Sequence, residues 1–453
     1  MKKNNERNDL TTGTVWKKLL VFLLPIAAGT IIQQLYNAVD GLIVGRFVGT
    51  NALAAVGGSS AQIINVLVGF FVAMTAGASV VIGQIFGAGK KEELNQAIGN
   101  AVTAMTVLGI LLGAFGLATA PWLLRVLQTP EETIEGAALY LRIYFLGVPF
   151  VMILNMESSI LRALGNSFHP FLYMVAGCIL NIALDLLFVL AFGWGVAGVA
   201  IATVAAQILN AALLTLQLTG KGKEFRIEIR NLRLKGVYLK NMMRLGIPSG
   251  LQSSMYSISN TIIQVAVNSL GTVTVASWAM SGKTDGIYWA VSNAMGAAIT
   301  SFVAQNRGAG KMDRVKQCMK QGMVMGFGVT ITISALLMIF GIPMLRILTP
   351  DEAVVERTYE IMSYFVPFYF TWVPVEVLSA VLRGAGDAFY PVVIIGMGIC
   401  LFRVIWVATV FAHFGTLLSL CLSYEVSWTI TGIALILYYR KGKWTSRQGL
   451  VDA

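Results

Sequence analysis

Apolar stretches of about 20 residues recur along the whole chain, and they constrain the fold more than any other feature of the sequence. A helix of that length spans the hydrocarbon core of a bilayer, which is roughly 30 Å thick. Charged residues make up only 12% of the chain, whereas soluble domains carry roughly 25%. The ~10-residue alternating segments of a transmembrane β-barrel are not visible. The sequence therefore predicts an all-α membrane protein.

Hydropathy, with glycine, proline and charged residues as boundaries, predicts twelve transmembrane helices. They are expected near residues 17–45, 53–85, 95–119, 136–160, 170–191, 196–218, 242–268, 276–305, 317–341, 357–381, 389–411 and 416–439.

Positive charge is divided unequally between the two sides that these helices define. Of the 33 lysines and arginines, 26 lie in the two terminal tails and in the loops near 90, 162, 221–244, 307–320 and 383. Five lie in the alternate loops, and Lys283 and Arg403 fall inside predicted spans. Because cytoplasmic loops carry an excess of Lys and Arg, both termini are expected in the cytoplasm. The same loops account for the net charge of +11 without a nucleic acid partner.

The second half of the sequence repeats the first. The matching segments are QIFGAGKKEE at 84–93 with QNRGAGKMDR at 305–314, LQTPEE at 127–132 with ILTPDE at 347–352, and LRALGNSFHP at 161–170 with LRGAGDAFYP at 382–391. The offsets are 221, 220 and 221 residues, so one duplication covers most of the chain.

Each half of the duplication contains six predicted spans, so both halves begin on the same side of the membrane. We expect an N-terminal lobe at 1–219, a cytoplasmic linker at 220–240, a C-terminal lobe at 241–441 and a cytoplasmic tail at 442–453. Two lobes without a nucleotide-binding motif are typical of a secondary transporter, since the glycine-rich GAGK segments lack the Ser or Thr of a phosphate-binding loop.

Two aspartates lie inside predicted spans of the first half. Asp40 follows Gln33 and Asn37 at helical spacing, and Asn181 precedes Asp185 by four residues, so each set shares one helix face. A charged carboxylate at membrane depth costs about 2.5–3.5 kcal/mol, which makes such residues functional candidates. A pair of carboxylates could exchange protons or hold Na⁺. The alternative is that Asp185 lies near the outer face and only hydrogen-bonds a helix end.

The remaining polar residues in the spans are candidates for a substrate cavity or for charge pairs. The cavity candidates are Gln33, Gln34, Tyr36, Asn37, Gln207, Gln252, Tyr256, Asn260 and Gln264, of which the last four form one stripe on the seventh span. Lys283, Asp285, Glu376 and Arg403 are charges at apparent membrane depth in the second half, and we expect at least one oppositely charged pair among them. Pro25 is expected to be a hinge in the first span.

The double six-span layout, Pro25, Asp40, the Asn181/Asp185 pair and the RALGN/RGAGD loops resemble the multidrug and toxic compound extrusion (MATE) family, in particular its prokaryotic DinF-like branch. The resemblance implies a V-shaped cavity between two pseudo-symmetric lobes. It also implies export of amphipathic, often cationic compounds driven by H⁺ or Na⁺ entry through a prokaryotic inner membrane. By position, Asp40, Asn181, Asp185 and Thr203 match the cation and proton residues of that branch.

The resemblance also sets the cofactor and partner expectations. No cofactor is expected, and no metal other than Na⁺ at the coupling site; the protein is expected to act as a monomer on small molecules. The other prokaryotic branch carries a glutamate after the proline of the seventh span, where this chain has Gln252 and Tyr256. A flippase for lipid-linked or polyisoprenoid substrates is the alternative, although such a protein should have a more basic cavity. A membrane-embedded enzyme is disfavoured, because the chain shows no His/Asp/Cys constellation.

Overall fold

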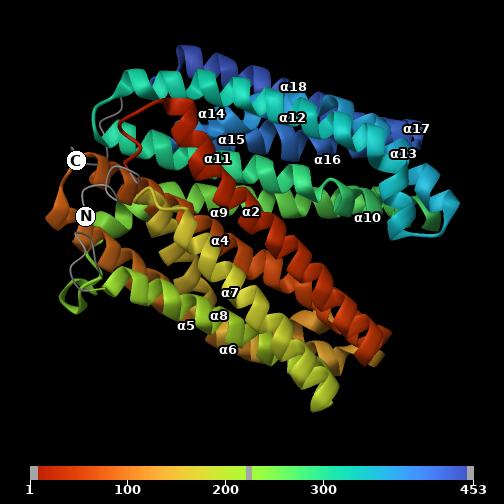
Figure 1. The fold of residues 1–453 in the computed structure, drawn as a ribbon. Coiled ribbons are helices and arrows are strands. Elements are labelled where there is room, and N and C mark those ends of the chain that lie inside the picture. The colour runs from red at the N-terminus through yellow and green to blue at the C-terminus, as the bar shows by residue number, and fades with distance from the viewer. Residues whose placement is uncertain (1–8, 221–226, 446–453) are drawn as a thin grey trace. The chain divides into compact units, whose positions relative to one another are not determined.

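The structure is a computed structural model that describes residues 9–220 and 227–445 (Figure 1). Within these residues, every regular element is a helix, so the all-α prediction is confirmed. Parts of the predicted linker (221–226) and of the predicted tail (446–453) lie outside the described residues.

The described chain divides into two compact units. Unit 1 contains Asp9 and Leu24–Gly250, and unit 2 contains Leu10–Leu23 and the chain from Leu251 onward. The predicted lobes and linker are segments of the sequence repeat, whereas these units are groups of residues in spatial contact. The predicted boundaries therefore remain predictions.

Unit 1 is built around α6, which packs against α4, α5 and α8, while α7 packs against α8. The elements of the first half are α2 (Val15–Ile43), η1 (Val44–Val48), α3 (Thr50–Gly57), α4 (Ser59–Gly87), α5 (Lys91–Val126), α6 (Glu131–Ala163), α7 (Phe168–Leu186), η2 (Leu187–Ala191), α8 (Gly195–Thr219) and η3 (Ile229–Asn231). Figure 1 shows α5, α6, α7 and α8 as neighbouring ribbons.

In unit 2, α11 packs against α12 and α14, α10 against α13, and α14 against α18. The elements of the second half are α9 (Gly236–Asn268), α10 (Thr272–Thr284), α11 (Gly286–Gly308), α12 (Met312–Leu348), α13 (Glu352–Phe365), η4 (Val366–Thr371), α14 (Trp372–Gly384), α15 (Phe389–Ile395), η5 (Gly396–Leu401), α16 (Phe402–Trp406), η6 (Val407–Phe411), α17 (Ala412–Phe414) and α18 (Leu417–Lys441).

The boundaries between the two units fall inside helices α2 and α9, near a proline in each. Helix α2 passes from unit 2 to unit 1 one residue before Pro25, and α9 passes from unit 1 to unit 2 two residues after Pro248. The start of α9 lies so close to α4 that a Cβ on Gly77 would stand 2.4 Å from the backbone nitrogen of Gly246. Glycine at 77 therefore permits this close approach of two helices.

Among the described residues, eleven helical segments are long and apolar enough to cross a membrane. The predicted seventh span corresponds to α9, which has 33 residues but is not apolar enough to be counted among the eleven. Its stripe of glutamine, tyrosine and asparagine accounts for this lower hydropathy. The second and eighth predicted spans are each interrupted, at Gly58 between α3 and α4 and at Asp285 between α10 and α11.

The backbone repeats in the two units as the sequence does. Gly89 and Gly310 both have left-handed φ, 72° and 71°, and Gly165 and Gly386 likewise have φ of 81° and 94°. Each pair is 221 residues apart. A residue without a Cβ adopts this conformation at little cost, so the duplicated turns require glycine at these positions. The predicted two pseudo-symmetric six-helix lobes are thus supported by matching local structure.

Candidate functional site

The two predicted carboxylates come together in unit 1. Asp40 near the end of α2 and Asp185 near the end of α7 lie within hydrogen-bonding reach of each other. The Asp185 side chain is fully buried. Because two ionised carboxylates repel each other and neither can donate, this contact is suited to a proton or a cation shared between them.

Asn181 joins Asp185 to α8. Its side-chain nitrogen donates to Asp185 Oδ2 at 2.9 Å, and its side-chain oxygen accepts from the Thr203 backbone N–H at 3.2 Å, with the amide oriented to satisfy both bonds. The helical spacing of four residues between Asn181 and Asp185 puts both groups on the same face of α7. The structure therefore brings together all four predicted coupling residues, Asp40, Asn181, Asp185 and Thr203.

Three oxygen atoms in this cluster are buried and lack a hydrogen-bond partner among the described residues: Asp40 Oδ1, Asp185 Oδ1 and Thr203 Oγ1. Buried oxygens normally have a partner, so three in one place indicate unmet capacity to bind a further group. Carboxylate, amide and hydroxyl oxygens are ligands suited to a hard cation or to a proton. The donor set fits H⁺ or Na⁺.

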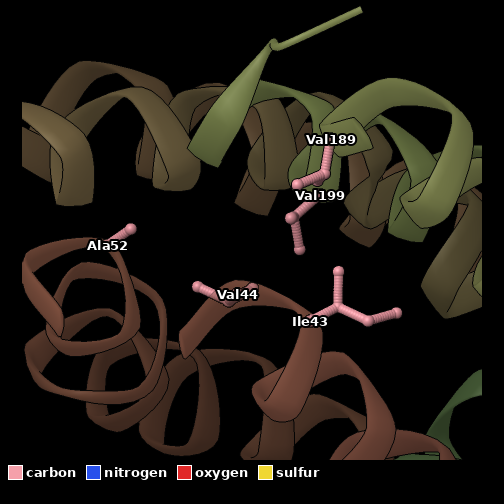
Figure 2. Close-up of a cluster of buried hydrophobic side chains, with 5 residues drawn as sticks. All are labelled: Ile43, Val44, Ala52, Val189 and Val199. Carbon is pink, nitrogen blue, oxygen red and sulfur yellow. The ribbon is translucent and has the colours of Figure 1, made fainter. Parts of the chain in front are cut away.

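An apolar cluster lies one helical turn beyond this polar site on each of its three helices. Val44 is four residues after Asp40, Val189 is four residues after Asp185, and Val199 is four residues before Thr203. Ile43 and Ala52 complete the cluster, and Figure 2 shows Ile43 and Val44 facing Val189 and Val199. Four residues of helix correspond to about 6 Å, so polar and apolar layers are adjacent.

Two of the helices change geometry at this apolar cluster. The π-helical turn η1 begins at Val44, and the π-helical turn η2 contains Val189. Short π-helical turns inside α-helices often mark functional sites. They place the transition from polar to apolar side chains at points where the helices deviate from regular geometry.

The other predicted cavity residues of unit 1 differ in exposure. Gln33, Gln34 and Asn37 have exposed side chains on α2, while Tyr36 and Gln207 are half-buried. Tyr36 lies against the cluster, with its hydroxyl near Thr203. Helix α2 runs continuously through Pro25.

Two tyrosines of α6, neither of them predicted from the sequence as a site residue, border the site. Tyr140 lies near both Asp40 and Asp185, and its ring stacks on that of Tyr144 at 6.2 Å between centroids. Their spacing of four residues, on the same face of α6, was the available signal. Glu157, deeper in α6, is fully buried and accepts a hydrogen bond from Thr215 Oγ1 at 2.8 Å.

Unit 2 contains a cavity of about 510 Å³. Three residues of the predicted polar stripe on α9, Tyr256, Asn260 and Gln264, line it. The fourth, Gln252, is not among the lining residues. The rest of the wall is mostly aromatic and comes from α10, α11, α13, η4, α14 and α18, together with Asp285 and Arg403.

The expected ion pair within the second half is absent, since none of the four charges pairs with another among the described residues. The Asp285 carboxylate accepts hydrogen bonds from the Tyr369 hydroxyl and the Trp289 indole. Arg403 donates from Nε to Ser427 and lies over the ring of Tyr424. Aromatic partners on other helices thus replace the expected opposite charge.

The other two charges lie outside the cavity wall. The Lys283 side chain is exposed, and the Glu376 carboxylate lies against Gly296 beside a separate cavity of about 20 Å³.

The chain resembles known proteins over nearly its whole length. The family model MatE matches residues 25–187 and 248–409. The chain is 27% identical over 444 residues to "Probable multidrug resistance protein YoeA" of Bacillus subtilis, covering 96% of this chain and 95% of that protein. It is 29% identical to "Probable multidrug resistance protein YpnP" of the same organism, covering 96% and 97%. A solved structure of an outward-facing multidrug resistance MATE family transporter of the MOP superfamily has the same fold, with a TM-score of 0.89, 22% identity and 98% coverage of each chain.

Proposed function

Because the chain belongs to the MatE family of multi-pass membrane transporters, with twelve membrane helices in two lobes, we propose that it is a cation-coupled antiporter. It exports amphipathic, often cationic compounds, and the entry of H⁺ or Na⁺ drives the export. The relatives named as multidrug resistance proteins support the substrate class.

The carboxylate cluster of unit 1 is the observation that carries the proposal. Asp40 and Asp185 lie within hydrogen-bonding reach, and three neighbouring oxygens are buried without a partner among the described residues. A site of this kind is costly in a membrane unless a proton or cation occupies it for part of a cycle. Binding of a proton or cation at the carboxylate pair is therefore linked to the conformation of the transporter.

The residues of the site have distinct roles in this proposal. Asp40 takes up the ion, Asp185 shares it, and Asn181 holds the Asp185 carboxylate while bonding the α8 backbone through Thr203. Gain of a proton by Asp40 changes its hydrogen bonding with Asp185. The part of α2 beyond Pro25 is then free to bend, because proline removes one hydrogen bond from the helix.

The charge distribution supports the proposed orientation. We propose that both termini lie in the cytoplasm of a prokaryotic cell, and that the protein spans the inner membrane as a monomer, without a cofactor. The basic loops, with 26 of the 33 lysines and arginines on one side, support this orientation.

Transport in proteoliposomes tests the coupling. Purified protein is reconstituted with a fluorescent amphipathic cation, ethidium, and ΔpH and the Na⁺ gradient are imposed separately. Wild-type protein should export ethidium with one of the two gradients. Asp40→Asn should lose this gradient-driven export, because the amide keeps the shape of the side chain but cannot ionise.

The matched control is Asp313→Asn, which removes an exposed carboxylate in the first turn of α12. It should export at the wild-type rate. Wild-type export by Asp40→Asn would refute the assignment of the site. Export that needs neither gradient would refute cation coupling altogether.

A further inference from the structure

The cavity of unit 2 has the size of a site for a small organic molecule. Its volume of about 510 Å³ lies within the ~300–1,000 Å³ range of ligand pockets. All of its lining residues belong to unit 2. None of the carboxylate-cluster residues of unit 1 lines this cavity, so the proposed coupling site does not account for it.

The wall of the cavity is a set of aromatic rings in mutual contact. Trp289 meets Trp372 and Trp428 edge to face, with centroids 5.4 and 6.0 Å apart, and Trp372 meets Trp428 at 6.0 Å. Trp372 is held further by a hydrogen bond from its indole to Ser292 at 3.1 Å. Rings fixed in this way form a preorganised aromatic wall, so a planar ligand that packs against it orders few protein side chains on binding.

One cation faces this aromatic cavity. Arg403 is 3% exposed, and its guanidinium carbon lies 3.7 Å from the ring centroid of Tyr424 and 5.7 Å from that of Trp428. Its Nε donates to Ser427 at 3.1 Å. Within the described chain, Arg403 forms no ion pair, and its terminal nitrogens form no hydrogen bond with protein groups.

The acidic residue of the cavity is already satisfied. Asp285 Oδ2 accepts from the Tyr369 hydroxyl at 2.7 Å and from the Trp289 indole at 3.4 Å. The carboxylate therefore stabilises the aromatic wall and does not neutralise Arg403. A buried arginine in this position has donors for an anion and a planar face held by aromatic rings.

We propose that the unit 2 cavity binds planar aromatic compounds that carry a carboxylate or a similar anionic group, with the anion on Arg403 and the ring against Trp289, Trp372 and Trp428. The proposal refines the proposed transport function, because such compounds, including zwitterions, form one class of its substrates.

Three isosteric probes test the proposal without transport: 2-naphthoate, 2-naphthalenemethanol and 2-naphthylmethylammonium. Their affinities are measured by equilibrium dialysis against full-length protein in lipid nanodiscs, and partition into protein-free nanodiscs is subtracted. Wild-type protein should bind 2-naphthoate about tenfold to a hundredfold more tightly than the neutral alcohol. Arg403→Gln should abolish that preference and leave the affinity for the alcohol unchanged.

The matched control is Lys320→Gln, which removes an exposed positive charge from α12, a helix that does not line the cavity. It should keep the wild-type preference. Arg403→Lys should keep part of it, because the charge remains while the planar donor geometry is lost. If Arg403→Gln does not fold, the proposal is judged from the order of the affinities of wild-type protein for the three probes.

Equal affinities for all three probes, or tightest binding of the ammonium, would overturn the proposal. Gradient-driven export of ethidium tests the transport proposal, whereas the ranking of the three probes is measured without an ion gradient and tests the binding proposal. Failure of one proposal is therefore distinguishable from failure of the other.

Discussion

The two halves of the chain have the same local backbone but opposite chemistry at corresponding places. Gly177 on α7 lies against the side chain of Asn210, and Gly398 in η5 lies against Thr431, with both residues 221 positions later. On α8 and α18, the same offset relates Thr203 to Tyr424. The polar site of unit 1 and the aromatic cavity of unit 2 are therefore built on equivalent helices.

The buried arginine also has a counterpart in the first half. Between η5 and α18 the offset is locally 222, as the left-handed glycines Gly193 and Gly415 show, with φ of 67° and 60°; it is 221 again at Asn210 and Thr431. The second half has two π-helical turns here, η5 and η6, where the first has η2 alone, which accommodates one more residue. At this offset Arg403 corresponds to Asn181. The residue that orients a carboxylate in one half is replaced by a cation in the other.

This difference shows how a duplicated membrane scaffold can hold two chemically different sites. Helix packing is kept by glycines and apolar positions, so side chains that face the interior of each lobe can change without loss of the fold. One half then supplies a site suited to ions, and the other a site suited to aromatic ligands. Variants in each half test whether the ion site and the aromatic ligand site are independent.

The largest expected effect is a separation of coupling from binding. Asp185→Asn should reduce gradient-driven export of ethidium to the level of protein-free liposomes, because one carboxylate alone cannot share an ion. The same variant should bind 2-naphthoate normally in nanodiscs. If Asp185→Asn also loses 2-naphthoate binding, the two sites are not independent and the comparison fails.

The second prediction tests whether the halves run parallel through the membrane. Lys90 and Lys311 occupy equivalent positions in the repeat, and Lys90→Cys and Lys311→Cys should both react with an impermeant maleimide from the cytoplasmic side only. Lys235→Cys, in the predicted linker, should behave in the same way. Labelling from outside intact cells at any of these positions would reverse the orientation, and labelling from opposite sides at 90 and 311 would exclude a parallel duplication.

The smallest expected effect concerns the equivalent glycines. A Cβ on Gly177 or Gly398 would stand 2.3 Å from a side-chain atom of Asn210 or Thr431. Gly177→Ala and Gly398→Ala should each lower the free energy of unfolding by about 1–3 kcal/mol, measured by thermal unfolding in detergent. Gly69→Ala and Gly328→Ala, where a Cβ would meet open space, should be neutral or slightly stabilising. A large loss in only one of the first two variants would contradict their equivalence.

The fold was predictable from sequence because its determinants are local or repeated. Twenty-residue apolar runs predict membrane helices directly, and three segments at nearly one offset reveal the duplication. The carboxylate site was predictable for a related reason. Asn181 and Asp185 share a helix face by spacing alone, and Asp40 is the one aspartate in its span.

The chemistry of unit 2 was harder to predict, because its contacts join helices far apart in sequence. Arg403 is satisfied by Ser427 and Tyr424, and Asp285 by Tyr369, 84 residues away. Counting charges suggested an ion pair, since sequence cannot show that aromatic rings surround each charge. The interruption of the eighth span at Asp285 and the π-helical turns likewise depend on tertiary packing.

The apolar layer of Val44, Val189 and Val199 has a consequence for energy conservation. A carboxylate pair that was open to water on both sides would let ions leak across the membrane, and the ion gradient would dissipate without transport of substrate. This layer offers no side-chain oxygen atom to replace the hydration shell of an ion, so it disfavours passage of an ion on that side of Asp40 and Asp185. If the pair takes up the coupling ion as proposed, an ion that enters from the other side would have to wait for a change of conformation before it could leave past this layer, which is the condition for stoichiometric exchange.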